Sequence, residues 1–266
     1  MSFRYELYHY IVKHVLGSNC PIANDMTLNR VLDVGTGTGL WALDMAREFP
    51  ASKIYGCDVA PVIDNSQTRP NIYWGNADLL RGLPYSDNSF DLVHQRQLCV
   101  YIGERQWPLV ARELYRLCRP GGKLCLIELL PTVTVASDIV SWHDCELSGR
   151  VAAVRCINDL IQQTLHKSGV RPEAVACLGD LLSITGFANV RHDTVELPRG
   201  DWAGQLGRCM LSYTHKLLIA TVPAVAASTD TPRQEYEDMI EHAMPVLALG
   251  RASHRLHVFT AEKPLQ

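Results

Sequence analysis

Short cysteine motifs and an excess of one charge are both missing from this sequence. Its nine cysteines include no two at C-x-x-C spacing, so neither a zinc ribbon nor a thioredoxin-type redox motif is indicated. Acidic and basic residues number 28 and 25, for a net charge of −3, which does not predict nucleic-acid binding by bulk electrostatics. Cys57, Cys118 and Cys125 lie in apolar segments, which favours reduced, buried thiols.

Long hydrophobic runs and targeting segments are missing as well. The longest apolar tract, residues 217–227, is shorter than a membrane span and contains Pro223. Residues 3–16 carry charged residues such as Arg4 and Lys13, unlike a secretory signal. No internal repeat, low-complexity tail or metal-ligand spacing stands out. We therefore expect a cytoplasmic protein that needs no metal and binds neither membrane nor nucleic acid.

Residues 30–42, RVLDVGTGTGLWA, join a short apolar run to three alternating glycines and the start of a helical pattern. The apolar run suits a strand buried on both faces, as in a parallel sheet. Gly35, Gly37 and Gly39 let the backbone turn tightly and approach a bound molecule. This pattern predicts a strand, a ligand-binding loop and a helix, although an ordinary tight turn with three glycines is the alternative.

Asp33 stands at the mouth of this loop, where a carboxylate would repel a pyrophosphate and attract a cationic amine. It therefore favours a ligand with an ammonium group. The D-x-G-x-G-x-G pattern resembles the cofactor loop of class I S-adenosylmethionine-dependent methyltransferases, which wraps the methionine half of the cofactor. A nicotinamide dinucleotide loop is the rival, because G-x-G-x-x-A also fits from Gly37 to Ala42.

Two further acids follow the next two predicted strands. Asp58 belongs to the apolar run 53–59 and stands 19 residues beyond Gly39, where a carboxylate reaches the ribose of either adenosyl cofactor. Asp78 follows the strand predicted at 71–77. In the methyltransferases an acid at this place accepts a hydrogen bond from the adenine amino group, whereas a surface turn is the alternative for Asp78 alone. The three acids together favour the methyltransferase interpretation.

Residues 90–124 point to one group within these methyltransferases. F-D-L-V-H-x-R at 90–96, a W-P pair and R-E-L-Y-R-L-x-R-P-G-G-x-L at 112–124 are similar to methyltransferases of fungal secondary metabolism, a group that includes regulators of those pathways. Residues 4–9 resemble their R-x-[DE]-x-Q-H helix, with Tyr8 in place of glutamine. The resemblance implies S-adenosylmethionine as cofactor, bound by Asp33, Gly35, Thr36, Gly37, Gly39, Asp58, Val59, Ala77, Asp78, Leu79 and Gln95.

We therefore expect one α/β domain over residues 1–266, with a Rossmann-like, doubly wound sheet of seven strands whose last strand is antiparallel. A helix at 3–16 could lie across the open edge of the sheet. Further strands are expected at 90–94, 123–130, 190–197 and 255–262, and helices at 107–118 and 172–186. The expected parts are a helical lid (1–29), a cofactor-binding core (30–130), a helical insertion with the last core helix (131–186), and C-terminal strands with a second helical insertion (187–266), the insertions forming a substrate cap.

Methyl transfer from a sulfonium is an in-line displacement that needs no protein nucleophile. Alignment of the reacting groups is worth about 7–11 kcal/mol, and a general base helps when the acceptor is a hydroxyl or an amine. His143 is the candidate catalytic base because histidine titrates near neutral pH, with a structural histidine as the alternative. Tyr8, Tyr101, Trp142 and Tyr213 are candidate substrate-binding residues, with core packing as the alternative for each.

The predicted function is S-adenosylmethionine-dependent methylation of a small molecule, at oxygen, nitrogen or a carboxyl group, in secondary metabolism. Two alternatives keep the same fold. In the first, the pocket performs cyclisation or pericyclic chemistry without methyl transfer. In the second, the chain is a regulatory protein that binds the cofactor. A homodimer is compatible with the sequence.

Overall fold

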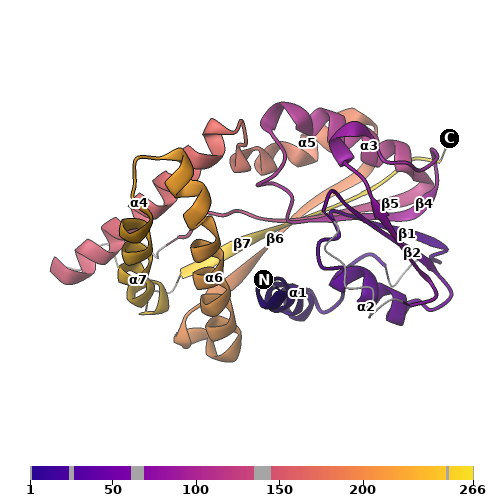
Figure 1. The fold of residues 1–266 in the computed structure, drawn as a ribbon. Helices are drawn as coiled ribbons and strands as arrows, with labels where there is room; N and C mark the ends of the chain where they lie inside the picture. The colour runs from indigo at the N-terminus through magenta and orange to yellow at the C-terminus, as the bar shows by residue number, and fades with distance from the viewer. Residues whose placement is uncertain (1, 24–26, 61–68, 135–144, 250–251, 266) are drawn as a thin grey trace.

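Seven strands form one sheet in the order β3-β2-β1-β4-β5-β7-β6 (Figure 1) in a computed structural model that describes residues 2–23, 27–60, 69–134, 145–249 and 252–265. β1 pairs in parallel with β2 and β4, and β7 is antiparallel to both β5 and β6. The predicted α/β fold with an antiparallel last strand is confirmed. The strands are β1 (Arg30–Val34), β2 (Lys53–Asp58), β3 (Ile72–Asn76), β4 (Phe90–Arg96), β5 (Cys118–Leu129), β6 (Ala188–Arg199) and β7 (Ala252–Glu262).

Helices cover both faces of the sheet (Figure 1). α1 (Ser2–Leu16) and α2 (Leu40–Glu48) pack on one face, and α3 (Trp107–Leu117) and α5 (Leu178–Thr185) pack on the other. Each face buries its own cluster of apolar side chains, which is the doubly wound arrangement that the sequence predicts. Short 3₁₀ helices connect these elements at η2 (Leu79–Arg81), η3 (Glu104–Gln106), η5 (Pro172–Cys177) and η6 (Asp201–Ala203).

α1 lies on a face of the sheet beside α2 and α6, and the expectation that it lies across the open edge is wrong. Ile11 and Val12 belong to the same buried cluster as Val31 of β1 and Leu92 of β4. Burial of this apolar stripe against the sheet removes more surface from water than an edge position would. Nδ1 of His9 in α1 lies 3.1 Å from Nη2 of Arg96, the last residue of β4, so α1 also reaches the carboxyl end of that strand.

α4 (Cys145–Lys167), α6 (Gly204–Ser228) and α7 (Arg233–Leu249) pack around a third apolar cluster, beyond the far ends of β6 and β7 (Figure 1). By length and composition alone, the segment Asp201–Ser228 is apolar enough to cross a membrane. α6 contacts α1, α4, α7 and β6, and 33% of its most apolar stretch is buried. α4 lies within residues 131–186, and α6 and α7 lie within residues 187–266, where the sequence predicts helical insertions. Their role as a substrate cap stays a prediction.

Several predicted boundaries are wrong. β4 continues to Arg96, and β5 begins at Cys118 and not at residue 123, so residues 119–122 belong to the strand. A Cβ at Gly122 would lie 2.8 Å from the backbone oxygens of both Arg119 and Phe90. Glycine at this position therefore lets β5 approach β4 through an irregular register. The helix expected from residue 172 begins as the 3₁₀ turn η5.

Candidate cofactor and acceptor site

The loop between β1 and α2 is a tight backbone cradle. Gly35, Gly37 and Gly39 have φ values of 68°, 53° and 76°, which glycine adopts without strain. The N–H groups of Gly35 and Thr36 both donate to the carbonyl of Cys57, at 2.9 and 3.0 Å, and tie the loop to β2. Among the described residues, no heavy atom lies within 4 Å of a Cβ placed at Gly37. This side of the loop therefore has room for a ligand.

Asp58 lies against the glycine loop at the carboxyl end of β2. One carboxylate oxygen accepts a hydrogen bond from the N–H of Gly37 at 2.9 Å, and the other accepts one from Ala60 at 3.0 Å. The N–H of Ala77 donates to the carbonyl of Asp58 at 3.0 Å, while the side chain of Val59 is exposed. The predicted ribose-binding acid and the predicted cradle are thus neighbours, and the ribose contact itself stays a prediction.

Asp33 is buried beneath the loop, with 3% of its surface exposed. Its Oδ1 lies 2.8 Å from Nδ1 of His94, and its Oδ2 accepts a hydrogen bond from the hydroxyl of Thr36 at 2.6 Å. Burial lowers the pKa of His94, so the neutral ring donates from Nδ1 to the carboxylate. Asp33 therefore supports the loop through two protein partners, and its direct contact with a cofactor ammonium stays a prediction.

Asp78 follows β3 at the same edge of the sheet. Its Oδ1 accepts a hydrogen bond from the N–H of Leu80 at 2.9 Å and so caps η2, and its Oδ2 lies 3.4 Å from Nε of the exposed Arg81. Leu79 is buried in the core. The acid stands beside the end of β2, as predicted, although the capping role competes with the predicted contact to adenine.

Gln95 and Glu128 form a buried polar pair at the carboxyl ends of β4 and β5. The amide of Gln95 lies 3.4 Å from Oε1 of Glu128, whose two oxygens accept hydrogen bonds from the N–H groups of Leu98 and Cys99 at 3.1 and 3.0 Å. Burial raises the pKa of Glu128 to about 7. Sequence analysis missed this residue, although a lone acid in the apolar run of β5 signals a buried carboxylate.

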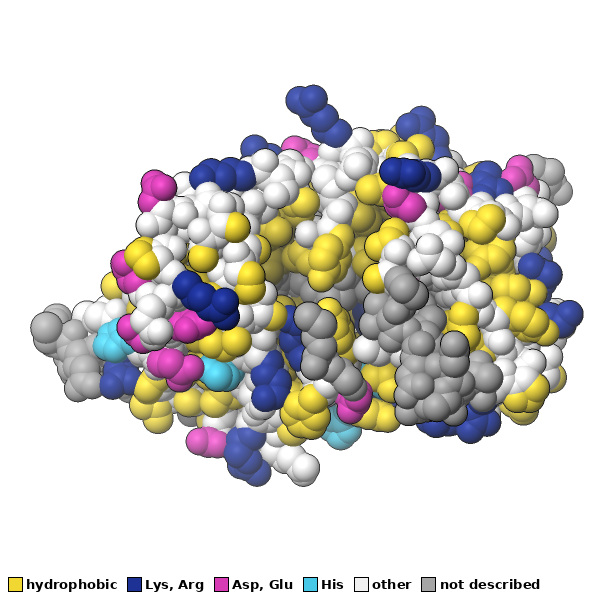
Figure 2. Space-filling view, in the orientation of Figure 1, with side chains coloured by type: hydrophobic (Ala, Val, Ile, Leu, Met, Phe, Trp, Pro, Cys, Tyr) yellow, Lys and Arg dark blue, Asp and Glu magenta, His cyan; other side chains and the backbone are white. Residues whose placement is uncertain are grey.

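Three of the predicted substrate-binding residues gather where α1 and α6 cover the sheet. The rings of Tyr8 and Tyr213 stack with centroids 5.0 Å apart. The hydroxyl of Tyr8 is buried and has no hydrogen-bond partner among the described residues, and the guanidinium carbon of Arg96 lies 5.6 Å from the centroid of the Tyr8 ring. Tyr101 is 65% exposed and close enough to Tyr213 to contribute, after burial, to raising its pKa. Figure 2 shows this side of the molecule hollowed near the start of α1.

Two predicted site residues lie outside the described residues, namely the candidate base His143 and the candidate substrate-binding Trp142. Their roles stay predictions. Across the described ranges, no group of three or more His, Cys, Asp or Glu side chains is arranged to hold a metal ion. The expectation that no metal is needed also stays a prediction.

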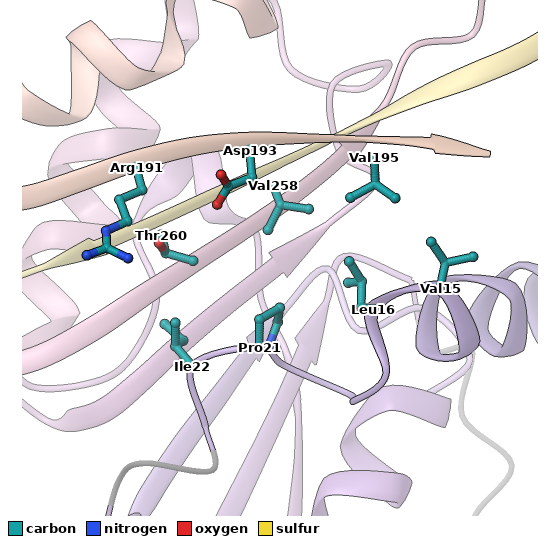
Figure 3. A pocket seen from close by; sticks show the side chains of 9 residues that line it. All are labelled: Val15, Leu16, Pro21, Ile22, Arg191, Asp193, Val195, Val258 and Thr260. Atoms are coloured by element: carbon teal, nitrogen blue, oxygen red, sulfur yellow. The ribbon is translucent and has the colours of Figure 1, made fainter.

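An open groove of about 380 Å³ lies away from these residues, between the end of α1 and the exposed face of β6 and β7 (Figure 3). Arg191 and Asp193 from β6 flank it, and the remaining lining is mostly aliphatic. None of the residues predicted for the cofactor or the acceptor belongs to it. The lining residues are Val15, Leu16, Pro21, Ile22, Arg191, Asp193, Val195, Val258 and Thr260.

Comparison with known proteins gives a consistent result. Residues 31–122 match the model of a family described as a methyltransferase domain. The chain is 25% identical to the protein-methionine methyltransferase laeA of Emericella nidulans, over 90% of this chain and 64% of that protein. It is 28% identical to the methyltransferase pytC of Aspergillus terreus, over 75% and 58% of the two chains.

A solved structure with the same fold is that of the [4+2]-cyclase SpnF, at 20% identity and a TM-score of 0.51, with 98% of this chain and 95% of that chain covered. The chain spans about half the length of other curated relatives, 52% of the secondary metabolism regulator laeA of Monascus pilosus and 44% of that of Aspergillus flavus. The strand order, the glycine cradle and these matches agree. Residues 31–122 therefore form a methyltransferase domain, and the chain has the fold of class I S-adenosylmethionine-dependent methyltransferases and resembles the methyltransferases of fungal secondary metabolism.

Proposed function

We propose that this chain transfers the methyl group of S-adenosylmethionine to a small-molecule acceptor in secondary metabolism. One observation carries the proposal, namely that the carboxylate of Asp58 bonds to the N–H of Gly37 within a glycine loop that has open space on its outer side. A sugar-binding acid and a backbone cradle are then side by side, as an adenosyl ligand requires. The methyltransferase-domain match over residues 31–122 supports this choice.

The described residues fit the cofactor. Gly39 precedes α2 without a side-chain cap, so the first N–H groups of α2 are available to a polar ligand. Asp58 would hold the ribose, Asp78 the adenine, and the loop from Gly35 to Gly39 the methionine half. When bound, S-adenosylmethionine supplies an electrophilic methyl group at the carboxyl ends of β1 and β4.

The contribution of the protein to such a reaction is alignment. Tyr8 and Tyr213 form an aromatic wall against which an acceptor can be held, because flat apolar rings orient a ligand at little entropic cost. Their burial by α1 and α6 also keeps water away from the reacting groups. Holding two reactants in line is worth about 7–11 kcal/mol, so this wall is expected to affect the rate more than any single proton transfer.

We favour a small-molecule acceptor over a protein side chain because Tyr8 and Tyr213 are 4% and 3% exposed. An acceptor that reaches this wall must enter a covered site, which suits a compact molecule. The printed name of the Emericella nidulans relative, a protein-methionine methyltransferase, nevertheless makes a methionine side chain the second candidate acceptor. The acceptor atom stays a prediction in either case.

The other expectations stay part of the proposal. We propose a cytoplasmic enzyme that acts without nucleic acid, membrane or metal, and a homodimer is compatible with this role. The fold shared with a [4+2]-cyclase keeps cyclisation without methyl transfer as an alternative, and the laeA relatives, named as regulators, keep a regulatory protein as another.

The test uses S-adenosylmethionine with a radiolabelled methyl group, incubated with the full chain and a fungal cell extract that is then separated by size. Label in small molecules supports the proposal, whereas label in protein favours the second acceptor. A new product without label favours cyclisation. The Asp58→Ala variant is the control for transfer that depends on this site. Failure of S-adenosylhomocysteine to bind in calorimetry would overturn the proposal.

A further inference from the structure

Arg96 is the last residue of β4 and lies at the carboxyl edge of the sheet. Gln95 pairs with Val34, the last residue of β1, so Arg96 stands one position further, level with the start of the glycine loop. Successive side chains of a strand point to opposite faces, and Arg96 therefore shares the face of His94, on which α1 and α2 pack. Its guanidinium carbon lies 5.6 Å from the centroid of the Tyr8 ring, beside the tyrosine wall.

His9 contacts this guanidinium directly, and Asp44 of another helix holds His9 in turn. Nη2 of Arg96 lies 3.1 Å from Nδ1 of His9 in α1, and Nε2 of His9 lies 3.1 Å from Oδ2 of Asp44 in α2. A guanidinium only donates hydrogen bonds, so Nδ1 of His9 is the acceptor and Nε2 carries the proton that bonds to Asp44. The chain Asp44–His9–Arg96 thus fixes both the tautomer of the histidine and the direction of the arginine.

The carboxylates near Arg96 already have other partners, so the positive charge of Arg96 is left without an ion pair among the described residues. Asp44 already pairs with Lys13 at 2.5 Å and with Arg47 at 3.0 Å, and within the described residues no carboxylate forms an ion pair with Arg96. Glu128 directs both of its oxygens to backbone N–H groups. Arg96 therefore keeps a full charge and most of its five N–H donors for another partner.

We propose that Arg96 binds a carboxylate group of a small molecule, with His9 and Asp44 as positioning residues. Arginine suits this role because its planar fork matches the two oxygens of a carboxylate. The proposal rests on the proposed function for the location of the cofactor. Two sources offer this chemistry, the amino-acid end of the cofactor and an acid group on the methyl acceptor.

The first arm of the test identifies the cofactor as the source. Calorimetry compares S-adenosylhomocysteine with S-adenosyl-3-thiopropylamine, which lacks only the carboxylate. We expect the unaltered chain to bind the first about 10- to 100-fold more tightly, Arg96→Gln to bind both equally, and Arg96→Lys to recover part of the preference. Arg47→Gln removes an arginine that also touches Asp44 and should behave like the unaltered chain.

The second arm identifies the acceptor as the source. The chain saturated with S-adenosylhomocysteine is titrated with 4-hydroxybenzoate and with the neutral 4-hydroxybenzamide. A preference for the acid that disappears in Arg96→Gln, together with no effect of Arg96 in the first arm, assigns the carboxylate to the acceptor. Thermal melting of each variant verifies folding.

His9 supplies an independent readout. His9→Gln keeps one acceptor for Arg96 and one donor for Asp44 and should retain the carboxylate preference, whereas His9→Phe should lower it about 10-fold. The inference is overturned if the unaltered chain binds the two adenosyl probes with equal affinity and also binds the acid and the amide with equal affinity. If neither adenosyl probe binds at all, the proposed function fails, and the benzoate pair on the free chain still decides the role of Arg96.

Discussion

The imidazole of His94 lies flat against the indole of Trp41, with ring centroids 3.8 Å apart and planes 3° apart. Both side chains are buried, and Trp41 donates a hydrogen bond to the carbonyl of Asn19 at 2.8 Å. Nδ1 of the His94 imidazole forms a hydrogen bond with the carboxylate of Asp33. The same carboxylate accepts a hydrogen bond from the hydroxyl of Thr36 in the glycine loop. An aromatic pair and a carboxylate thus support the cradle from the core side.

Replacing Asp33 should loosen this support. Asp33→Asn keeps the shape but removes the charge that strengthens the hydrogen bonds to His94 and Thr36, and we expect the free energy of unfolding to fall by about 1–3 kcal/mol. Urea unfolding measures it. The matched control is Asp87→Asn, because that carboxylate is largely exposed and its ion pair should contribute less than about 1 kcal/mol. Equal stability of the two variants would show that the buried contacts do not hold the loop.

Asp58→Ala should weaken the adenosyl site. Loss of a charged acceptor is expected to lower the affinity for S-adenosylhomocysteine by about 10- to 100-fold, through the ribose and through the hydrogen bond to Gly37. Calorimetry measures the affinity, and circular dichroism verifies the fold. Asp238→Ala is the control, since that acid is exposed on α7 and bonds to Gln234. An unchanged affinity would disprove the ribose assignment.

Glu128 should make stability depend on pH. Burial raises its pKa from 4.5 to about 7, so the folded chain binds the proton more tightly than the unfolded chain. The stability that this proton contributes is complete below pH 4.5 and is lost as the pH rises through about 7. The full loss is on the order of 3 kcal/mol. Urea unfolding between pH 4.5 and 8 should therefore show a weaker pH dependence in Glu128→Gln than in the unaltered chain, and parallel curves would contradict the assignment.

Tyr8→Phe separates a functional hydroxyl from a structural ring. The hydroxyl is buried, and no described residue forms a hydrogen bond with it, so its removal should leave the melting temperature unchanged or raise it slightly. Stacking on Tyr213 should persist because the ring remains. We expect the rate of methyl transfer to fall about 10-fold if this hydroxyl orients the acceptor. Unchanged turnover in Tyr8→Phe, with a loss in Tyr213→Ala, would assign the site to the aromatic wall alone.

Local signals made the core of the fold predictable. Alternating glycines permit the positive φ values of a tight loop, and an acid at the end of an apolar run lies at the carboxyl edge of a parallel sheet. Asp33, Asp58 and Asp78 were therefore placed correctly at the ends of β1 and β2 and just after β3. Boundaries set by pairing were less predictable, since β5 continues through Gly122 because β4 lies beside it.

The sequence by itself determined the approximate positions of the strands and helices of the cofactor half, the glycine cradle and the class of domain, because these depend on spacing along the chain. Only the tertiary structure decided which side chains from distant parts of the sequence come into contact. It stacks Tyr8 on Tyr213 and links His9 to Arg96 and Asp44, and it raises the pKa of Glu128 by burying it. Contacts and solvation between distant segments depend on packing, which no local pattern records.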